Sequence, residues 1–142
     1  MSTLFKARNN PYKDSQAKTA SKEQLLVMLY DTLVNNMQRI VDILDKKRGD
    51  GSIPLPLITE KVSLVNYNME IINTLNFSLD MKLGGEISQN LRTLYLGAQS
   101  NLLDAHIRDD VEPFRRYLKI FSDLRDAWRQ ALVNISTNPH SP

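Results

Sequence analysis

The side chains that most often carry out chemistry in proteins are scarce in this chain. It has no cysteine and two histidines, His106 and His140, which excludes disulfides, thiolate nucleophiles and thiolate zinc sites. Di-metal sites in helical bundles use a glutamate three residues before a histidine, but that position before His106 is Leu103, and Asp104 points to another helix face. Gly84-Gly85 is too short for a phosphate-binding loop. We therefore expect no catalytic residue, no metal site and no cofactor.

The charge is unevenly distributed along the chain. The formal net charge is +2, yet residues 1–22 hold five basic residues and one acidic residue, a net charge of +4 that leaves −2 for the remainder. A basic tail can bind nucleic acid or an anionic membrane surface, but here the charges are spread out and no series of stacking aromatic residues separates them. No apolar run reaches the roughly 18 residues of a transmembrane helix, and the first residues lack the apolar core of a signal peptide. We expect a cytosolic protein with no membrane insertion and no nucleic-acid partner.

Glycine and proline divide the chain into segments of helix length. Apart from the two ends of the chain, they occur in a cluster from Gly49 to Pro56, at Gly84-Gly85, at Pro113 and singly at Gly97. The four segments between these positions are roughly 23–27 residues long, which is typical of helices rather than strands. Short links place successive helices side by side in opposite directions. We predict an all-α fold, an antiparallel four-helix bundle over residues 21–135, with flexible tails at residues 1–20 and 136–142.

Residues at the ends of these segments predict where the helices begin and end. Ser21 followed by Gln24 matches a capping box, so the first helix should begin there. A basic run followed by Gly49 should end that helix, because positive charge is favourable at a helix C-terminus and glycine stops the helix. The other helices should begin near Pro56, near Glu86, and after Asp109 or Asp110.

Two of the predicted helices carry more apolar surface than a bundle core requires. Every helix has one apolar face for the core, which in the second and third helices includes Ile58, Val62 and Ile87, and Trp128 in the fourth helix should fill the core. The second and third helices carry a further apolar stripe, which could pack against neighbouring helices or remain open to a partner. From these stripes we select as candidate partner contacts Leu64, Ile71, Leu75, Leu96, Leu103 and Ile107.

A series of short motifs runs along most of the chain, from about residue 10 to residue 133. The motifs are Asn10-Pro11-Tyr12, Thr19-Ala20-Ser21, Leu26-Val27-Met28-Leu29-Tyr30-Asp31, Leu79-Asp80, Gly84-Gly85-Glu86-Ile87, Asn90-Leu91, Leu94-Tyr95, Leu102-Leu103-Asp104-Ala105 and Leu124-Arg125-Asp126-Ala127-Trp128. Their order and spacing resemble the flagellin-specific export chaperone family (FliS). Residues 96–101 depart from the family pattern, and this departure adds Leu96 to the outer stripe of the third helix.

The resemblance implies a function without catalysis. The chain would be a cytosolic chaperone that binds the disordered C-terminal segment of flagellin, prevents premature polymerisation, and keeps flagellin competent for flagellar type III secretion through the export apparatus. In this family the tail around Tyr12 can cover the apolar groove until the client displaces it, so Tyr12 joins the candidate contacts. We expect a monomer or weak dimer. The alternative is a non-enzymatic bundle that acts as a dimeric interaction module, or as a basic-tailed binder of nucleic acid or a membrane surface.

Overall fold

Four helices make up most of the part of the chain that the structure describes. This computed structural model describes residues 21–137, with side chains up to residue 134. The helices are α2 (Lys22–Leu44), α3 (Leu55–Phe77), α4 (Gly85–Arg108) and α5 (Val111–Thr137). The predicted N-terminal tail lies outside the described residues, and α5 continues two residues past the predicted end of the bundle at residue 135.

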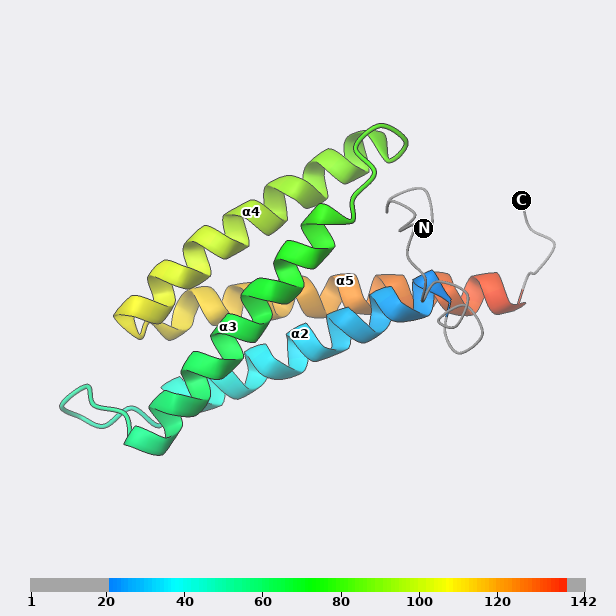
Figure 1. Ribbon diagram of the computed structural model, residues 1–142. Helices are drawn as coiled ribbons and strands as arrows, with labels where there is room; N and C mark the ends of the chain where they lie inside the picture. The colour runs from blue at the N-terminus through cyan, green and yellow to red at the C-terminus, as the bar shows by residue number, and fades with distance from the viewer. Residues whose placement is uncertain (1–20, 138–142) are drawn as a thin grey trace, which may run out of the picture.

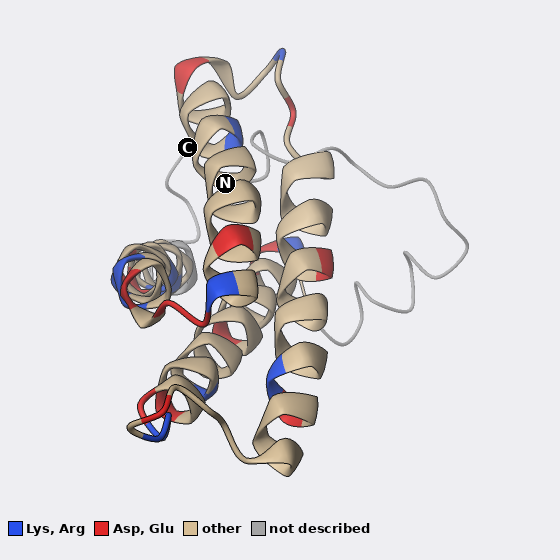
Figure 2. Ribbon diagram, turned by 90° about the vertical axis from the view of Figure 1, so that its left-hand side faces the viewer, with Lys and Arg blue, Asp and Glu red and all other residues tan. Residues whose placement is uncertain are grey.

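The helices form an antiparallel ring. Figure 1 shows each helix running opposite to the one before it, and both α2 and α4 contact α3 on one side and α5 on the other. Figure 2 shows α5 nearly end-on, with α3 and α4 side by side and long stretches of both without charged residues. Even so, none of the four helices described is long and apolar enough to cross a lipid bilayer. The predicted all-α, antiparallel four-helix bundle is confirmed.

The core is centred on aromatic side chains from three helices. Tyr30 of α2 and Tyr95 of α4 are fully buried, and their hydroxyl groups hydrogen-bond to each other. Phe121 of α5 packs against both rings, with centroids 6.1 Å from Tyr30 and 6.4 Å from Tyr95. Burial raises the pKa of both tyrosines, so both hydroxyls stay protonated. Trp128, expected inside the core, is only partly buried and packs against the core with its ring edge-on to Tyr30.

The start of α2 is as predicted, but its end is not. Ser21 Oγ accepts a hydrogen bond from the Gln24 backbone N–H at 3.1 Å, and the Gln24 side chain accepts one from the Ser21 N–H at 2.7 Å, which confirms the capping box. The helix ends at Leu44, short of the expected glycine, so the basic run lies beyond it. Asp45, which follows Leu44, forms an ion pair with Arg115 of α5. This contact between helices cannot be read from the local pattern.

The two aspartates of the α4–α5 turn have different roles. Asp109 closes α4 with a left-handed backbone, φ 52°, a conformation that aspartate tolerates better than most residues. Asp110 caps α5, because its carboxylate accepts a hydrogen bond from the Glu112 backbone N–H at 3.1 Å. Of the two predicted caps, Asp110 is therefore correct. The Asp109 carboxylate instead contacts Lys61 of α3.

Candidate functional site

Three of the candidate contact residues lie on the surface of α4. Leu103 and Ile107 are 50% and 74% exposed, and Leu96, two turns earlier, is 46% exposed. Exposed apolar side chains that cluster in this way commonly mark a binding surface. Tyr12, the remaining candidate outside α3, lies outside the described residues.

The three candidates on α3 are less accessible. Ile71 and Leu75 are 5% and 1% exposed and belong to the core, and Leu64 is half-buried against it. The expectation that Ile71 and Leu75 lie on an outer stripe is wrong. Because α3 packs against both α2 and α4, these two helices enclose its wide apolar face around Ile71 and Leu75.

Other residues of α3 and α4 are exposed although the sequence pattern assigned them to the core. Ile58 and Val62 of α3 are half-exposed, and Ile87 of α4 is largely exposed. At this end of α3 the inward position is taken by Lys61, which is 4% exposed. The apolar residues beside Lys61 are therefore turned outward.

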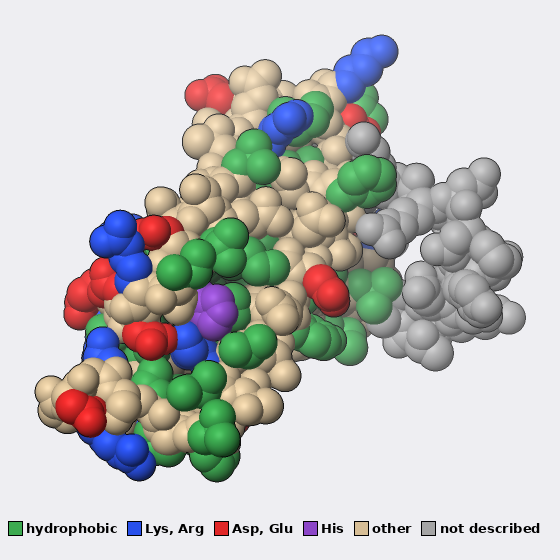
Figure 3. Space-filling view, turned by 60° about the vertical axis from the view of Figure 1, so that its left-hand side comes forward, with side chains coloured by type: hydrophobic (Ala, Val, Ile, Leu, Met, Phe, Trp, Pro, Cys, Tyr) green, Lys and Arg blue, Asp and Glu red, His purple; other side chains and the backbone are tan. Residues whose placement is uncertain are grey.

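The exposed apolar residues of α3 and α4 meet across one contact between the helices. Lys61 Nζ of α3 lies 2.9 Å from His106 Nδ1 of α4, and on each helix exposed apolar residues lie three positions before and one position after the contacting residue. Figure 3 shows hydrophobic side chains gathered around a histidine on this face. We define the α3/α4 apolar surface as Ile58, Val62, Leu103 and Ile107.

A polar cluster around the buried Lys61 lies next to the α3/α4 apolar surface. Lys61 Nζ forms an ion pair with Asp109 Oδ1 at 2.5 Å and donates to His106 Nδ1 at 2.9 Å and to the His106 backbone oxygen at 3.2 Å. Lys47, in the loop between α2 and α3, donates to the Asp109 backbone oxygen at 2.9 Å. All three donors of the Lys61 ammonium group thus have acceptors, as a buried charge requires. These four residues, the Lys61 cluster, tie together α3, the end of α4 and the α2–α3 loop.

His106 is held in its neutral form by its surroundings. Burial lowers the pKa of His106, the positive charge of Lys61 lowers it further, and the negative charge of Asp109 raises it in part. The contacts of the Lys61 cluster within the described residues are with carboxylate, imidazole and backbone oxygen groups, and none involves a hydroxyl or a thiol. Within residues 21–137 there is also no group of three or more potential metal ligands.

Sequence reasoning missed Lys61. It lies four residues before Val65 and eleven before Ile72, both of which are buried, and this spacing places it on the inner face of α3. A lysine at such a position signals a buried charge, and a buried charge needs a partner. The partner, Asp109, comes from a turn distant in sequence, so the local pattern could indicate the need for an acceptor without identifying it.

The Gly84-Gly85 motif builds the turn that joins α3 to α4. The Asp80 backbone oxygen accepts hydrogen bonds from the Gly84 N–H at 2.8 Å and from Ser88 Oγ at 3.0 Å. A Cβ at Gly84 would lie 1.7 Å from Ser88 Oγ and 2.7 Å from that Asp80 oxygen. Gly85 has a positive φ of 57°. The two positions therefore require glycine for different reasons, close packing and backbone conformation.

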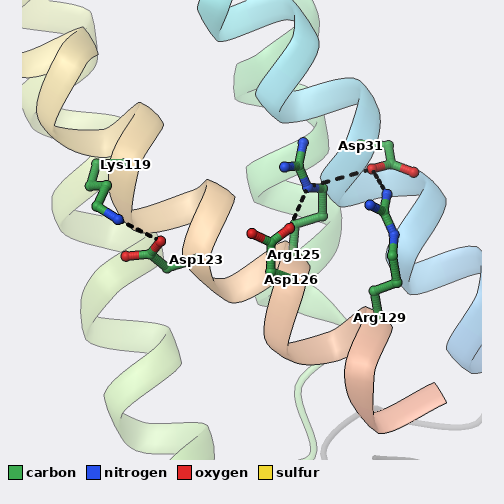
Figure 4. Close-up of polar contacts among 6 residues, drawn as sticks. All are labelled: Asp31, Lys119, Asp123, Arg125, Asp126 and Arg129. Atoms are coloured by element: carbon green, nitrogen blue, oxygen red, sulfur yellow. Dashed lines mark hydrogen bonds and ion pairs between the residues drawn. The ribbon is translucent and has the colours of Figure 1, made fainter. Parts of the chain in front are cut away.

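Ion pairs mark the side of the bundle where α2 meets α5. Figure 4 shows Asp31 of α2 reached by two arginines of α5, with Arg129 Nη2 at 2.5 Å and Arg125 Nε at 3.8 Å. Lys119 and Asp123 pair along α5 at 2.8 Å. Exposed pairs of this kind contribute about 0–1 kcal/mol each. The surface most suited to a partner by apolar contact is therefore the one formed by α3 and α4.

Comparison with known proteins identifies the family of this chain. The model of the family described as "Flagellar protein FliS" matches residues 4–135. The chain is similar to the flagellar secretion chaperone FliS of Escherichia coli K12, with 29% identity over 87% of this chain and 85% of that protein. It is also similar to the proteins of the same name from Salmonella typhimurium LT2, with 28% identity over 82% of this chain and 81% of the relative, and from Vibrio cholerae, with 25% identity over 82% and 79%. The chain therefore belongs to the FliS family.

Proposed function

We propose that this protein holds the C-terminal segment of flagellin in the cytosol through the α3/α4 apolar surface. The family and the names of its relatives support the role of a flagellar secretion chaperone, which is not an enzymatic function. The observation that carries the choice of surface is the exposure of Leu103 and Ile107 beside the half-exposed Ile58 and Val62. A flagellin segment held there would be unable to polymerise and would stay competent for flagellar type III secretion.

Burial of apolar side chains supplies the free energy for such a complex. Complete removal of a valine, leucine or isoleucine side chain from water contributes about 1.5–3 kcal/mol. A disordered segment that folds on binding loses about 2–5 kcal/mol of that gain to its own ordering. Partial burial of four chaperone residues, together with the client's own apolar residues, offsets this cost. An amphipathic helix laid along α3 and α4 is the binding mode that suits such a surface.

The proposed contacts differ from the set selected from the sequence. Leu96 extends the α3/α4 apolar surface along α4. Leu64 is not assigned to this surface, because its side chain is partly buried against the core. Ile71 and Leu75 are left out because their side chains are enclosed in the core. Tyr12 keeps its place as a proposed cover of the surface in the absence of client.

Calorimetry with a peptide of the flagellin C-terminus tests the proposal. The double variant Leu103→Lys, Ile107→Lys should lose at least about tenfold in affinity, because two charges would have to be desolvated on binding. Its helicity and melting temperature should stay close to those of the parent protein, since both side chains are exposed. Met28→Lys on α2, at a position 57% exposed, is a matched control that should bind like the parent.

Three results would contradict the proposal. If the parent protein gives neither heat of binding nor a complex with the peptide, the C-terminal segment of flagellin is not its client. Global unfolding of the double variant would place Leu103 and Ile107 in the core. Sedimentation that shows a stable dimer, abolished by the same double variant, would assign the α3/α4 apolar surface to contact between two copies of the chain.

A further inference from the structure

His106 presents a polar atom within the α3/α4 apolar surface. Its Nδ1 is occupied by Lys61, while its other ring nitrogen, Nε2, has no hydrogen-bond partner in the part of the chain that the structure describes. The side chain is partly exposed and lies between the four residues of the α3/α4 apolar surface, all of them more than a third exposed. The Nε2 atom is therefore the polar group that a client would cover together with the apolar residues.

The contact with Lys61 decides which nitrogen of His106 carries the hydrogen. A lysine ammonium group has three hydrogens to donate and no lone pair to accept with. Nδ1 of His106 must therefore be the acceptor in its contact with Lys61, and the neutral ring carries its hydrogen on Nε2. Burial and the positive charge of Lys61 lower the pKa of His106, which keeps the ring in this neutral form. The outward-facing group is thus a hydrogen-bond donor.

We propose that His106 is a specificity-determining residue for the client, and that its Nε2–H donates a hydrogen bond to a hydroxyl or amide oxygen in the otherwise apolar face of the bound segment. The inference rests on the proposed function, since it concerns the same surface and the same client. A client that covers this N–H without offering an acceptor leaves a polar group unsatisfied, which disfavours binding. The surface therefore selects for one polar residue at a defined place among apolar ones.

The chemistry of the acceptor follows from the surroundings of His106. The backbone oxygens inside a client helix are already bonded within that helix, so the acceptor must come from a side chain. Lys61 and Asp109 carry opposite charges that are paired with each other, so this pair offers no net charge to an ionised acceptor. Serine, threonine, asparagine or glutamine of the client fits the site.

Two substitutions separate the inward and outward contacts of His106. In His106→Asn the amide oxygen takes the place of Nδ1, which keeps an acceptor for Lys61 but removes the outward donor. In His106→Gln the amide nitrogen takes the place of Nε2, which keeps the outward donor but removes the acceptor for Lys61. We expect His106→Asn to bind the flagellin C-terminal peptide about three- to tenfold more weakly than the parent, the loss typical of one hydrogen bond. His106→Gln should stay within about twofold of the parent affinity while being less stable to urea.

An alanine scan of the polar residues of the peptide completes the test. One serine, threonine, asparagine or glutamine should lower affinity for the parent and for His106→Gln when replaced, and should have no effect on binding to His106→Asn. Equal binding by His106→Asn and the parent, equal losses in both variants, or no polar position coupled to His106 would overturn the inference. In any of these three cases the proposed function still stands if the parent protein binds the peptide and the double variant Leu103→Lys, Ile107→Lys does not. If the parent does not bind the peptide, both fall together.

Discussion

Lys61 is the residue whose environment the fold must satisfy most completely. It is 4% exposed and charged, and its ammonium group loses nearly all contact with water on folding. Asp109 and two acceptors of His106 replace that water. Buried ion pairs are weak contributors to net stability, but a buried charge that loses its partner is strongly unfavourable. The loss of stability should therefore depend on which member of the Lys61 cluster is replaced.

Replacement of Asp109 should be more harmful than replacement of Lys61. Asp109→Asn keeps a residue that tolerates the left-handed backbone but takes the countercharge from Lys61. The expected loss is about 1–3 kcal/mol, below the roughly 3–5 kcal/mol of a fully buried pair, because the Asp109 side chain is 35% exposed. Lys61→Met removes the charge itself and should stay within about 1 kcal/mol of the parent protein. Urea unfolding measures both, and a greater loss in Lys61→Met would contradict this account.

The lowered pKa of His106 predicts how stability changes with pH. The groups that face the ring are Lys61 of α3 and Asp109 of the α4–α5 turn, and Lys47 of the α2–α3 loop contacts Asp109. The unfolded chain takes up a proton at the ordinary histidine pKa of 6.5, whereas in the folded protein the pKa of His106 lies lower. The contribution of neutral His106 is thus complete above about pH 6.5 and is lost as the pH falls toward the folded-state pKa. Urea unfolding from about pH 7 to pH 5 should show a steeper loss in the parent than in His106→Asn, and equal slopes would contradict the prediction.

At the scale of helices and turns, local sequence signals identify the starts better than the ends. The capping box of Ser21 and Gln24 and the cap at Asp110 are local arrangements of side chain and backbone, so the sequence alone predicts them. The end of α2 at Leu44 is accompanied by the contact of Asp45 with Arg115, seventy positions away. A pattern read within one segment contains no information about such a partner.

The turn between α3 and α4 should tolerate no side chain at Gly84. A Cβ there would collide with Ser88 Oγ and with the Asp80 backbone oxygen, and the backbone atom cannot move without opening the turn. We expect Gly84→Ala to lower the free energy of unfolding by about 1–3 kcal/mol, the usual cost of overpacking. Gly49→Ala is a suitable control, because a Cβ at Gly49 meets nothing within 4 Å. Equal stability of the two variants in urea would show that the Gly84 turn is not closely packed.

For the molecule as a whole, packing decides which apolar faces stay open. The sequence correctly predicts that α3 and α4 carry more apolar surface than the core needs. It does not predict which positions are left over, because that depends on the angle at which α3 lies between its two neighbours. Ile71 and Leu75 are enclosed, whereas Ile58 and Val62 are turned outward beside the buried Lys61. The candidate site can thus be predicted in part. The spacing of apolar residues along α4 indicates Leu103 and Ile107, whereas the exposure of the α3 residues Ile58 and Val62 becomes evident only in the assembled bundle.

The composition of the α3/α4 apolar surface predicts the thermodynamics of client binding. Burial of apolar area gives a negative heat-capacity change, and binding that does not use ion pairs is little affected by salt screening. The buried charge of Lys61 is already paired with the partly exposed Asp109, so this pair offers the client no net attraction. Calorimetry with the flagellin peptide at several temperatures and salt concentrations should therefore show a negative slope of enthalpy with temperature and a nearly constant affinity with salt. A basic-tailed binder would behave differently, because release of counterions makes its affinity fall steeply with salt. If such a fall occurs and disappears when residues 1–20 are removed, the basic N-terminal segment and not the α3/α4 apolar surface makes the main contact.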